Sequence, residues 1–390
     1  MSSLMKERYQ LYIGGEEVES SDDEVIDVIN PATEEPFATV PAGTSEDVDR
    51  AVAAASEAQE EWAKKTPVER AGVLREIADT LRENAESLGE VGTRDQGKPM
   101  SSSIGTVHGT ASFFDFYAGA ADKIEGETIP VDEDTLDFTV REPYGVSGHI
   151  IPWNAPLAII GQGVAPSLAA GNAAVIKPAP TAPLLALNFA EICREAGVPD
   201  GVVNVVTGAT EPGAALSGHE DVDTISFTGS VPTGSAVMES AAKNITPVTL
   251  ELGGKNPVIV SDTADIDDAV EGVMKGAFSF SGQKCSATSR VYVDDDVLDE
   301  FTDKLVAETE QLTVGQPTDR DSFLSPLIDE SALEHYLEIS ERARADGNVL
   351  TGGAEVTDPD LPDGRYVEPT VVTDIPHEHE LAREEHFVPF

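Results

Sequence analysis

The chain has 390 residues, 40% of them hydrophobic, which is enough for a well-buried interior and for two or three domains. Its 25 lysines and arginines are opposed by 72 aspartates and glutamates, so the formal net charge is −47. Such a surface repels phosphates, and we expect neither nucleic acid nor a membrane as a partner. The sequence has no apolar run long enough to span a membrane and residues 1–10 do not resemble a signal peptide, so a cytoplasmic location is expected.

The acidic residues are spread through the chain and do not gather in one tail. This pattern is typical of cytoplasmic proteins of halophiles, in which molar salt screens charge repulsion over about 3 Å. An acid-rich mesophile protein is the alternative. The two cysteines, Cys193 and Cys285, indicate neither a disulfide scaffold nor a cysteine-based zinc site, and Cys193 is expected to be buried in a helix. The closest histidines, His377 and His379, are expected on the solvated surface and not on a metal ion.

The N-terminal third is predicted to change from strands to helices. Residues 1–43 form short extended pieces, interrupted by glycine and proline. Thr44 is predicted to cap the first helix, with Asp47 completing a capping box. Thr66 is predicted to cap the second, followed by a proline at the first helical position and by Glu69 in the box.

Beyond these helices, residues 124–141 are predicted to form a long hairpin with an acidic turn. Short apolar strands then alternate with helices, which predicts a parallel sheet covered on both faces. The predicted strands are 146–151, 173–176, 202–206, 224–227 and 248–250, and the predicted helices lie near 184–196, 213–217 and from 234 onward. A second such stretch begins at Pro257, with a helix over 265–280 and a strand over 290–293. The predicted fold class is therefore α/β, with two Rossmann-like parallel-sheet lobes.

Two segments carry side chains suited to acyl chemistry. Cys285 lies among small residues that leave room for a carbonyl, and its thiol needs activation, to which Lys284 could contribute. An inert buried cysteine is the alternative. Glu251 ends an apolar strand before two glycines, where lost solvation would raise its pKa toward that of a general base. A carboxylate turned to solvent is the alternative.

Two further segments could stabilise negative charge. Asn154 stands between two prolines after a strand and could donate to an oxyanion, or it could simply form a turn. Residues 227–234 lead from a strand through Gly-Ser into a helix, whose free amides would suit a phosphate. The usual dinucleotide pattern GxGxxG is not convincingly present, so this segment alone is weak evidence for a cofactor.

Taken together and in this order, these segments resemble the aldehyde dehydrogenase superfamily. The resemblance rests on Pro-Trp-Asn, Phe-Thr-Gly-Ser, Glu-Leu-Gly-Gly-Lys and Gly-Gln-x-Cys, supported by Lys177-Pro178 and by the motif at 384–387, and it extends from about Tyr12 to Phe390. It implies that an aldehyde is oxidised to a carboxylic acid with NAD or NADP through a thioester on Cys285.

The resemblance also implies roles for individual residues. Cys285 is the nucleophile, Glu251 is the base for the deacylating water, and Asn154 forms the oxyanion hole with the Cys285 N–H. Lys177 lies by the adenosine ribose, while Glu385 and Phe387 hold the nicotinamide ribose and ring. The remaining cofactor-binding residues that it implies are Gly229, Ser230 and Gly234 at the pyrophosphate, with Ile151, Pro152, Trp153 and Leu252.

The resemblance divides the chain into domains as well. Residues 1–123 and 142–252 correspond to the cofactor-binding domain, and residues 253–390 to the catalytic domain. Residues 124–141 correspond to the oligomerisation element of a homodimer or homotetramer. Pro180 stands where many NAD-preferring members have a glutamate that repels a 2′-phosphate, so NADP remains open, although NAD is favoured.

The family usually continues well beyond the Glu-Glu-x-Phe motif, whereas this sequence ends three residues after Phe387. We therefore expect part of the catalytic lobe, part of the substrate funnel and the last oligomerisation strand to be missing. An inactive, truncated relative that serves as a binding subunit or is a non-functional fragment is the alternative function. A cysteine hydrolase or acyltransferase would need a histidine base, and none is evident in the sequence.

Overall fold

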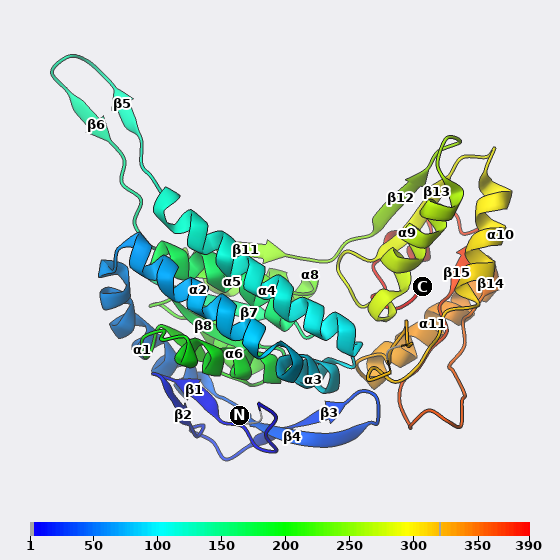
Figure 1. Ribbon diagram of the computed structural model, residues 1–390, viewed down its shortest axis with the longest axis horizontal. Helices are drawn as coiled ribbons and strands as arrows, with labels where there is room; N and C mark the ends of the chain where they lie inside the picture. Colours follow the sequence, from blue (N-terminus) through cyan, green and yellow to red (C-terminus); the bar gives the residue numbers. More distant parts are fainter. Residues whose placement is uncertain (1–3, 320) are drawn as a thin grey trace. The chain divides into compact units, whose positions relative to one another are not determined.

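The computed structural model describes residues 4–319 and 321–390, in which a seven-stranded sheet organises the first of two units (Figure 1). The strand order is β11-β10-β7-β8-β9-β1-β2, and the first five are parallel. The strands span Leu11–Ile13 (β1), Glu16–Val18 (β2), Val146–Ile151 (β7), Ala173–Pro178 (β8), Val203–Val205 (β9), Thr224–Thr228 (β10) and Val248–Glu251 (β11). The predicted parallel sheet is confirmed.

Two groups of helices cover this sheet. Helices α5 (Pro156–Ala170) and α6 (Leu184–Glu195) pack together on β7, β8 and β9, with α2 (Pro67–Glu83) outside them. Helices α1 (Ser45–Lys64), α7 (Thr210–Gly218) and α8 (Val231–Ala242) form the second group. Every residue of β7 and β8 is buried, so the two groups cover opposite faces, as expected for strands of a parallel sheet.

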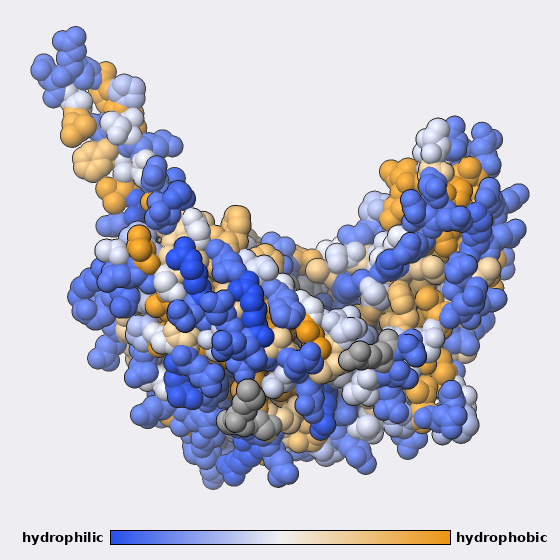
Figure 2. Space-filling model, in the orientation of Figure 1, coloured by the Kyte–Doolittle hydropathy of each residue, from blue (hydrophilic) through white to orange (hydrophobic). Residues whose placement is uncertain are grey.

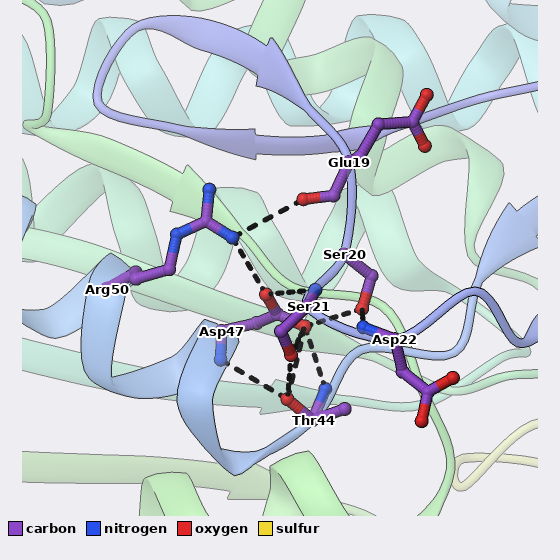
Figure 3. A network of polar contacts seen from close by, with 7 residues as sticks. All are labelled: Glu19, Ser20, Ser21, Asp22, Thr44, Asp47 and Arg50. Atoms are coloured by element: carbon purple, nitrogen blue, oxygen red, sulfur yellow. Dashed lines mark hydrogen bonds and ion pairs between the residues drawn. The ribbon is translucent and has the colours of Figure 1, made fainter.

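The predicted helix starts at Thr44 and Thr66 are confirmed, and each forms a complete capping box. At the first, Thr44 Oγ1 accepts from Asp47 N at 3.4 Å, and the Asp47 carboxylate accepts from Thr44 N at 3.0 Å. The Asp47 side chain is fully buried, and its carboxylate accepts hydrogen bonds from further donors in the segment before the helix and in the helix itself (Figure 3). These are Ser20 Oγ at 2.6 Å, Ser21 N at 3.0 Å and Arg50 Nη1 at 2.9 Å.

The predicted hairpin is also confirmed. Strands β5 (Thr128–Pro130) and β6 (Leu136–Phe138) pair antiparallel and extend away from the helices of the first unit (Figure 1). Their apolar side chains are uncovered: Leu136 is 78% and Phe138 58% exposed. In Figure 2 the hairpin carries hydrophobic residues along its length and hydrophilic residues at its tip.

The second unit consists of Ile29–Pro36, Gly92–Ser103 and Leu252–Phe390. Tyr366 Oη donates to Ala32 O at 3.3 Å, and Met100 N donates to Pro317 O at 2.8 Å. These contacts join the two short pieces, which the sequence analysis assigned to the first domain, to the second unit. Contacts across more than 200 residues leave no local signal in a sequence.

Strands of the second unit form two separate pairs. Strand β12 (Asn256–Val260) is parallel to β13 (Thr288–Val293), whereas β14 (Asn348–Thr351) is antiparallel to β15 (Val371–Thr373). The parallel sheet predicted for this lobe is thus present only as β12–β13 within the described residues. The helices of this unit are α9 (Ile266–Phe278), α10 (Leu298–Thr309), α11 (Glu330–Asp346) and α12 (Glu380–Arg383).

The remaining elements connect or straddle the units. They are β3 (Val25–Asn30), β4 (Glu35–Pro41), α3 (Ala85–Gln96) and α4 (Met100–Ala120), each of which has residues in both units. Of two 3-10 turns, Ala121–Lys123 belongs to the first unit and Ser279–Gly282 to the second. Throughout 4–319 and 321–390, the helices lack the combination of length and apolar character that a membrane span requires.

Candidate active site

In the first unit, the candidate residues lie at or just after the carboxyl ends of four adjacent parallel strands. Pairing registers place Ile151 of β7 opposite Pro178 of β8, and Thr228 of β10 opposite Glu251 of β11. Because parallel strands end at one edge of a sheet, residues 151–154, Lys177, Gly229, Ser230 and Glu251 lie along that edge. Ligands of open α/β sheets bind at such edges.

Asn154 occupies the bend between β7 and α5. Its side chain is 8% exposed, and Pro156 begins the helix two residues later. Trp153 and Pro152 beside it are half-buried. A nearly buried amide held between a strand and a helix has little conformational freedom, which suits a fixed hydrogen-bond donor.

Lys177 is a buried cation near the end of β8. It is 7% exposed, and desolvation lowers its pKa to about 8. Its alkyl chain passes α7, where a Cβ atom added at Gly213 would lie 3.8 Å from Lys177 Cδ. A neighbouring anion would regain the electrostatic energy that burial of this ammonium group costs.

The turn from β10 to α8 is held by hydrogen bonds of its backbone amides. Gly229 N donates to Glu251 O at 3.0 Å, which ties the turn to β11. Ser230 is the exposed N-cap of α8, and its Oγ accepts from Thr233 N at 3.5 Å. Gly234 is buried in the first turn, and its N–H donates to Ser230 O at 2.9 Å. The N-terminus of this 12-residue helix is suited to an anion.

Glu251 is exposed, so the desolvation predicted for it from its leucine neighbours is wrong. The reason lies in its strand. Strand β11 is the outermost strand of the sheet, and its residues alternate between half-buried and exposed. Glu251 falls on the exposed side, which leaves its carboxylate accessible to water.

In the second unit, Cys285 is exposed on the loop between α9 and β13. The segment before it contains three consecutive residues with positive φ: Phe280 (55°), Ser281 (52°) and Gly282 (69°). Residues other than glycine rarely adopt this backbone conformation, so surrounding contacts must stabilise it at Phe280 and Ser281. Ser281 Oγ donates to Ser325 O and accepts from Ser325 N at 3.1 Å.

Gln283 anchors the same loop and is fully buried. Its Oε1 accepts from Ile328 N at 2.9 Å, and its Nε2 donates to Phe280 O at 3.4 Å and Pro326 O at 3.3 Å. The sequence analysis quoted this glutamine within a motif but gave it no role, and it missed Ser281. The signal for both was their proximity in the sequence to the candidate nucleophile, Cys285.

Lys284, named as a possible activator of the thiol, is directed elsewhere. Its Nζ donates to Ser279 Oγ at 2.5 Å and to Lys275 O at 3.4 Å, at the end of α9. Burial lowers the pKa of Lys284, and the neighbouring Cys285 opposes this shift. The positive charge of Lys284 therefore acts on the Cys285 thiol only through their electrostatic interaction, because its hydrogen bonds go to other groups.

Glu385 and Phe387 lie near the same loop. They line a small pocket of about 20 Å³ together with Lys255 and Lys284. Glu385 Oε1 accepts from Gly254 N at 3.2 Å. Burial raises the pKa of Glu385, while the Gly254 N–H and the Lys255 charge oppose the rise. Desolvation lowers the pKa of Lys255 to about 8.

The structure thus brings the candidate residues together as two groups. Asn154, Lys177, the β10–α8 turn and Glu251 share one sheet edge in the first unit. Cys285, Glu385 and Phe387 belong to the second unit, which Leu252 begins.

The other residues considered have structural roles. Cys193 is buried in α6, as predicted. His379 caps α12 and lies 3.3 Å from Asp346, whereas His377 contacts Tyr292 Oη at 3.4 Å, so each has a different neighbour. Among the residues described, His, Cys, Asp and Glu side chains form no cluster of three or more that could hold a metal ion.

Comparisons with known proteins show which family this chain resembles. A family model described as the aldehyde dehydrogenase family matches residues 18–390. A hydroxyisobutyraldehyde dehydrogenase of Mycolicibacterium austroafricanum is 41% identical over 381 residues, which are 97% of this chain and 75% of the relative.

Solved structures give the same result. Betaine aldehyde dehydrogenase of Staphylococcus aureus in complex with NAD+ has a TM-score of 0.95 at 38% identity, covering 98% of this chain and 77% of that chain. A 3,6-anhydro-L-galactose dehydrogenase in complex with NAP has a TM-score of 0.95 at 34% identity, covering 98% and 81%. The predicted α/β fold class is confirmed by these similarities.

Proposed function

Because the chain belongs to the aldehyde dehydrogenase family, we propose that it oxidises an aldehyde to a carboxylic acid through a thioester on Cys285. The observation that carries the proposal is the exposed thiol of Cys285 on a loop that buried side chains anchor. An exposed thiol can meet a carbonyl, and an anchored loop keeps it in one orientation.

In the proposed reaction, the Cys285 thiolate attacks the aldehyde carbon and forms a C–S bond. The carbonyl oxygen becomes an oxyanion, which the Asn154 amide and the Cys285 N–H stabilise. One such donor typically contributes about 2.7–4 kcal/mol to the transition state. When bound, the nicotinamide supplies the acceptor for the hydride that leaves the thiohemiacetal carbon.

The thioester that remains on Cys285 is then hydrolysed. Glu251 takes a proton from water, the hydroxide adds to the thioester carbon, and the C–S bond breaks to release the acid and the thiolate. The accessibility of Glu251 to water supports this role. The assignment rests on the family resemblance and on this exposure, and not on a desolvated carboxylate.

The first unit has groups that fit a dinucleotide. Its buried cation, Lys177, gains from a polar or anionic partner, and the positive end of the α8 helix dipole suits a pyrophosphate. Gly229, Ser230 and Gly234 form that turn, while residues 151–153 and Leu252 border it in the proposal. Glu385 and Phe387 would hold the nicotinamide ribose and ring.

We propose NAD as the cofactor, with NADP as the alternative. The relatives named above were solved with NAD+ in one case and NAP in the other. Replacement of Lys177 by methionine keeps an unbranched side chain one atom shorter and removes its charge. We expect the variant to bind the cofactor at least tenfold more weakly with an unchanged rate of thiol alkylation at Cys285.

We also propose that the β5–β6 hairpin joins subunits of a homodimer or homotetramer. An apolar hairpin in a protein of net charge −47 is an unfavourable surface in water unless another protein covers it. Burial of Leu136 and Phe138 in such an interface would remove large apolar side chains from water.

The decisive experiment follows reduced nicotinamide in molar KCl, with a panel of aldehydes that includes hydroxyisobutyraldehyde and betaine aldehyde. Cys285→Ala should abolish reduction, and Asn154→Ala should lower kcat about 10²–10³-fold. Glu251→Gln should release one equivalent of reduced cofactor per thiol and then stall. The matched control, Cys193→Ala, should keep its activity.

Other results would contradict the proposal. Turnover that persists in Cys285→Ala would exclude the thioester route. Acyl-ester cleavage without any cofactor-dependent oxidation would instead favour a cysteine hydrolase. Folded protein that oxidises no aldehyde in the panel would favour the non-catalytic alternative.

A further inference from the structure

The side chain of Asn256 holds the loop that carries Cys285. Its Nδ2 lies 2.8 Å from the carbonyl oxygen of Cys285 and 2.9 Å from that of Ala287. Both partners are carbonyl oxygens, which only accept hydrogen bonds, so the amide nitrogen of Asn256 must face them. One side chain thus uses both of its N–H groups on two peptide groups of the loop.

Asn256 lies beside the point at which the Cys285 loop continues into strand β13. It is the first residue of β12 and pairs with Thr288, whereas the next residue, Pro257, pairs with Arg290. Ser289 is therefore the extra residue of a bulge in β13, and its Oγ donates to Asn256 O at 3.5 Å. The side chain and the carbonyl of Asn256 together join β12 to the start of β13.

The loop is held at both ends by different residues. Gln283 anchors the entry through Ile328 N, and Ala287 N donates to Lys284 O at 3.0 Å within the loop. Asn256 anchors the exit. With the Cys285 carbonyl held, rotation about its Cα–C bond is restricted, so the directions of the thiol and of the N–H are set together.

We infer that Asn256 is a positioning residue for Cys285, an inference that rests on the proposed function of this cysteine as nucleophile. Asn256 touches neither substrate nor the reacting sulfur in this role. It keeps the Cys285 peptide in the one orientation that presents the thiol for attack. Misplacement of a reacting group by about 1 Å can cost 10²-fold in rate, so two hydrogen bonds on this peptide have a measurable effect.

Lys284 precedes Cys285 in the sequence, but it does not help to hold the Cys285 peptide. Its ammonium group donates to Ser279 Oγ and Lys275 O, which lie before the loop. Substitution of Asn256 is therefore the direct test of the exit anchor.

The informative variant is Asn256→Asp, which is nearly isosteric but places a carboxylate oxygen against two carbonyl oxygens. We expect kcat per alkylatable Cys285 thiol to fall 10- to 100-fold, with the KM for NAD within twofold of the wild type. As the pH falls into the range in which the introduced carboxyl is protonated, it can donate one hydrogen bond again. The ratio of variant to wild-type kcat should then rise.

The matched control is Asn348→Asp, which introduces the same charge at an exposed position of β14 in the same unit. It should keep kcat, the KM and the pH profile within twofold of the wild type. Asn256→Ser, which retains a single donor, should fall between the wild type and Asn256→Asp. Circular dichroism and the count of alkylatable thiols correct every rate for the folded fraction.

The outcomes separate the two proposals. If Cys285→Ala abolishes oxidation but Asn256→Asp behaves like Asn348→Asp, the positioning role is wrong and the proposed function stands. If Cys285→Ala remains active, the function itself is wrong. If Asn256→Asp and Asn256→Ser both fail to fold, Asn256 is a general structural residue and the inference is overturned.

Discussion

The buried carboxylate of Asp47 allows a quantitative prediction about the first unit. Asp47 has no exposed surface and accepts hydrogen bonds from Thr44, Ser20, Ser21 and Arg50 (Figure 3). A hydrogen bond to a charged group contributes about 1.5–3 kcal/mol, and each buried donor left unpaired costs about 1–3 kcal/mol. These contributions are not additive, so we expect Asp47→Ala to lower the free energy of unfolding of this unit by roughly 3 kcal/mol.

The pH dependence of this effect has a definite sign. Burial raises the pKa of Asp47, but hydrogen bonds from Ser20, Thr44 and Ser21 outweigh burial and hold the pKa below its ordinary value. The carboxylate therefore stabilises the folded state fully above the unfolded pKa of about 3.9. This contribution is lost as the pH falls through the lower folded pKa, so the difference between wild type and variant should shrink there.

Denaturant unfolding in molar KCl, followed by tryptophan fluorescence, is the suitable assay. Trp62 is 1% exposed in α1 itself, and its Nε1 donates to Leu168 O at 3.0 Å, so its emission reports on this unit. Glu46→Ala, at an exposed residue in the same helical turn, should cost less than about 1 kcal/mol. Equal effects of the two substitutions would refute the reasoning.

Three further predictions concern the second unit, the charge and the hairpin. Gly282→Ala should destabilise the second unit by about 1–3 kcal/mol in calorimetry, because φ is +69° and the new Cβ would lie 2.3 Å from Val388 O. Gly272→Ala, in α9 with nothing within 4 Å, should instead stabilise it by about 0.5–1 kcal/mol, and the opposite order would be inconsistent with this account. Raising KCl from about 0.1 to 1 M shortens the screening length from about 10 to 3 Å. If the net charge of −47 is an adaptation to salt, this change should raise the midpoint temperature of thermal unfolding. Sorbitol at the same osmolarity should produce a smaller rise. Phe138→Asp should dissociate the proposed oligomer in light scattering, while Thr135→Asp at the turn should not; an unchanged mass would exclude the hairpin as an interface.

Local chemistry made much of the structure predictable from the sequence. The boxes at Thr44 and Thr66 depend only on residues within one helical turn, and both are present. Strands of the parallel sheet such as Ala173–Pro178 were predictable because burial on both faces favours apolar residues along the strand. The candidate residues at the ends of β7, β8, β10 and β11 were found in the same way, since each stands at or just after the end of a predicted strand.

The sequence by itself determined the candidate side chains for the proposed chemistry, because motifs such as Gly-Gln-x-Cys are short and continuous. Only the tertiary structure decided how those side chains are held. The exposure of Glu251 depends on its strand being the outermost strand of the sheet, and the anchors of Cys285 come from Asn256, Ser325 and Ile328. These partners lie 29 to 45 positions from the residues they hold, and no local pattern encodes a contact that forms only when the chain has folded.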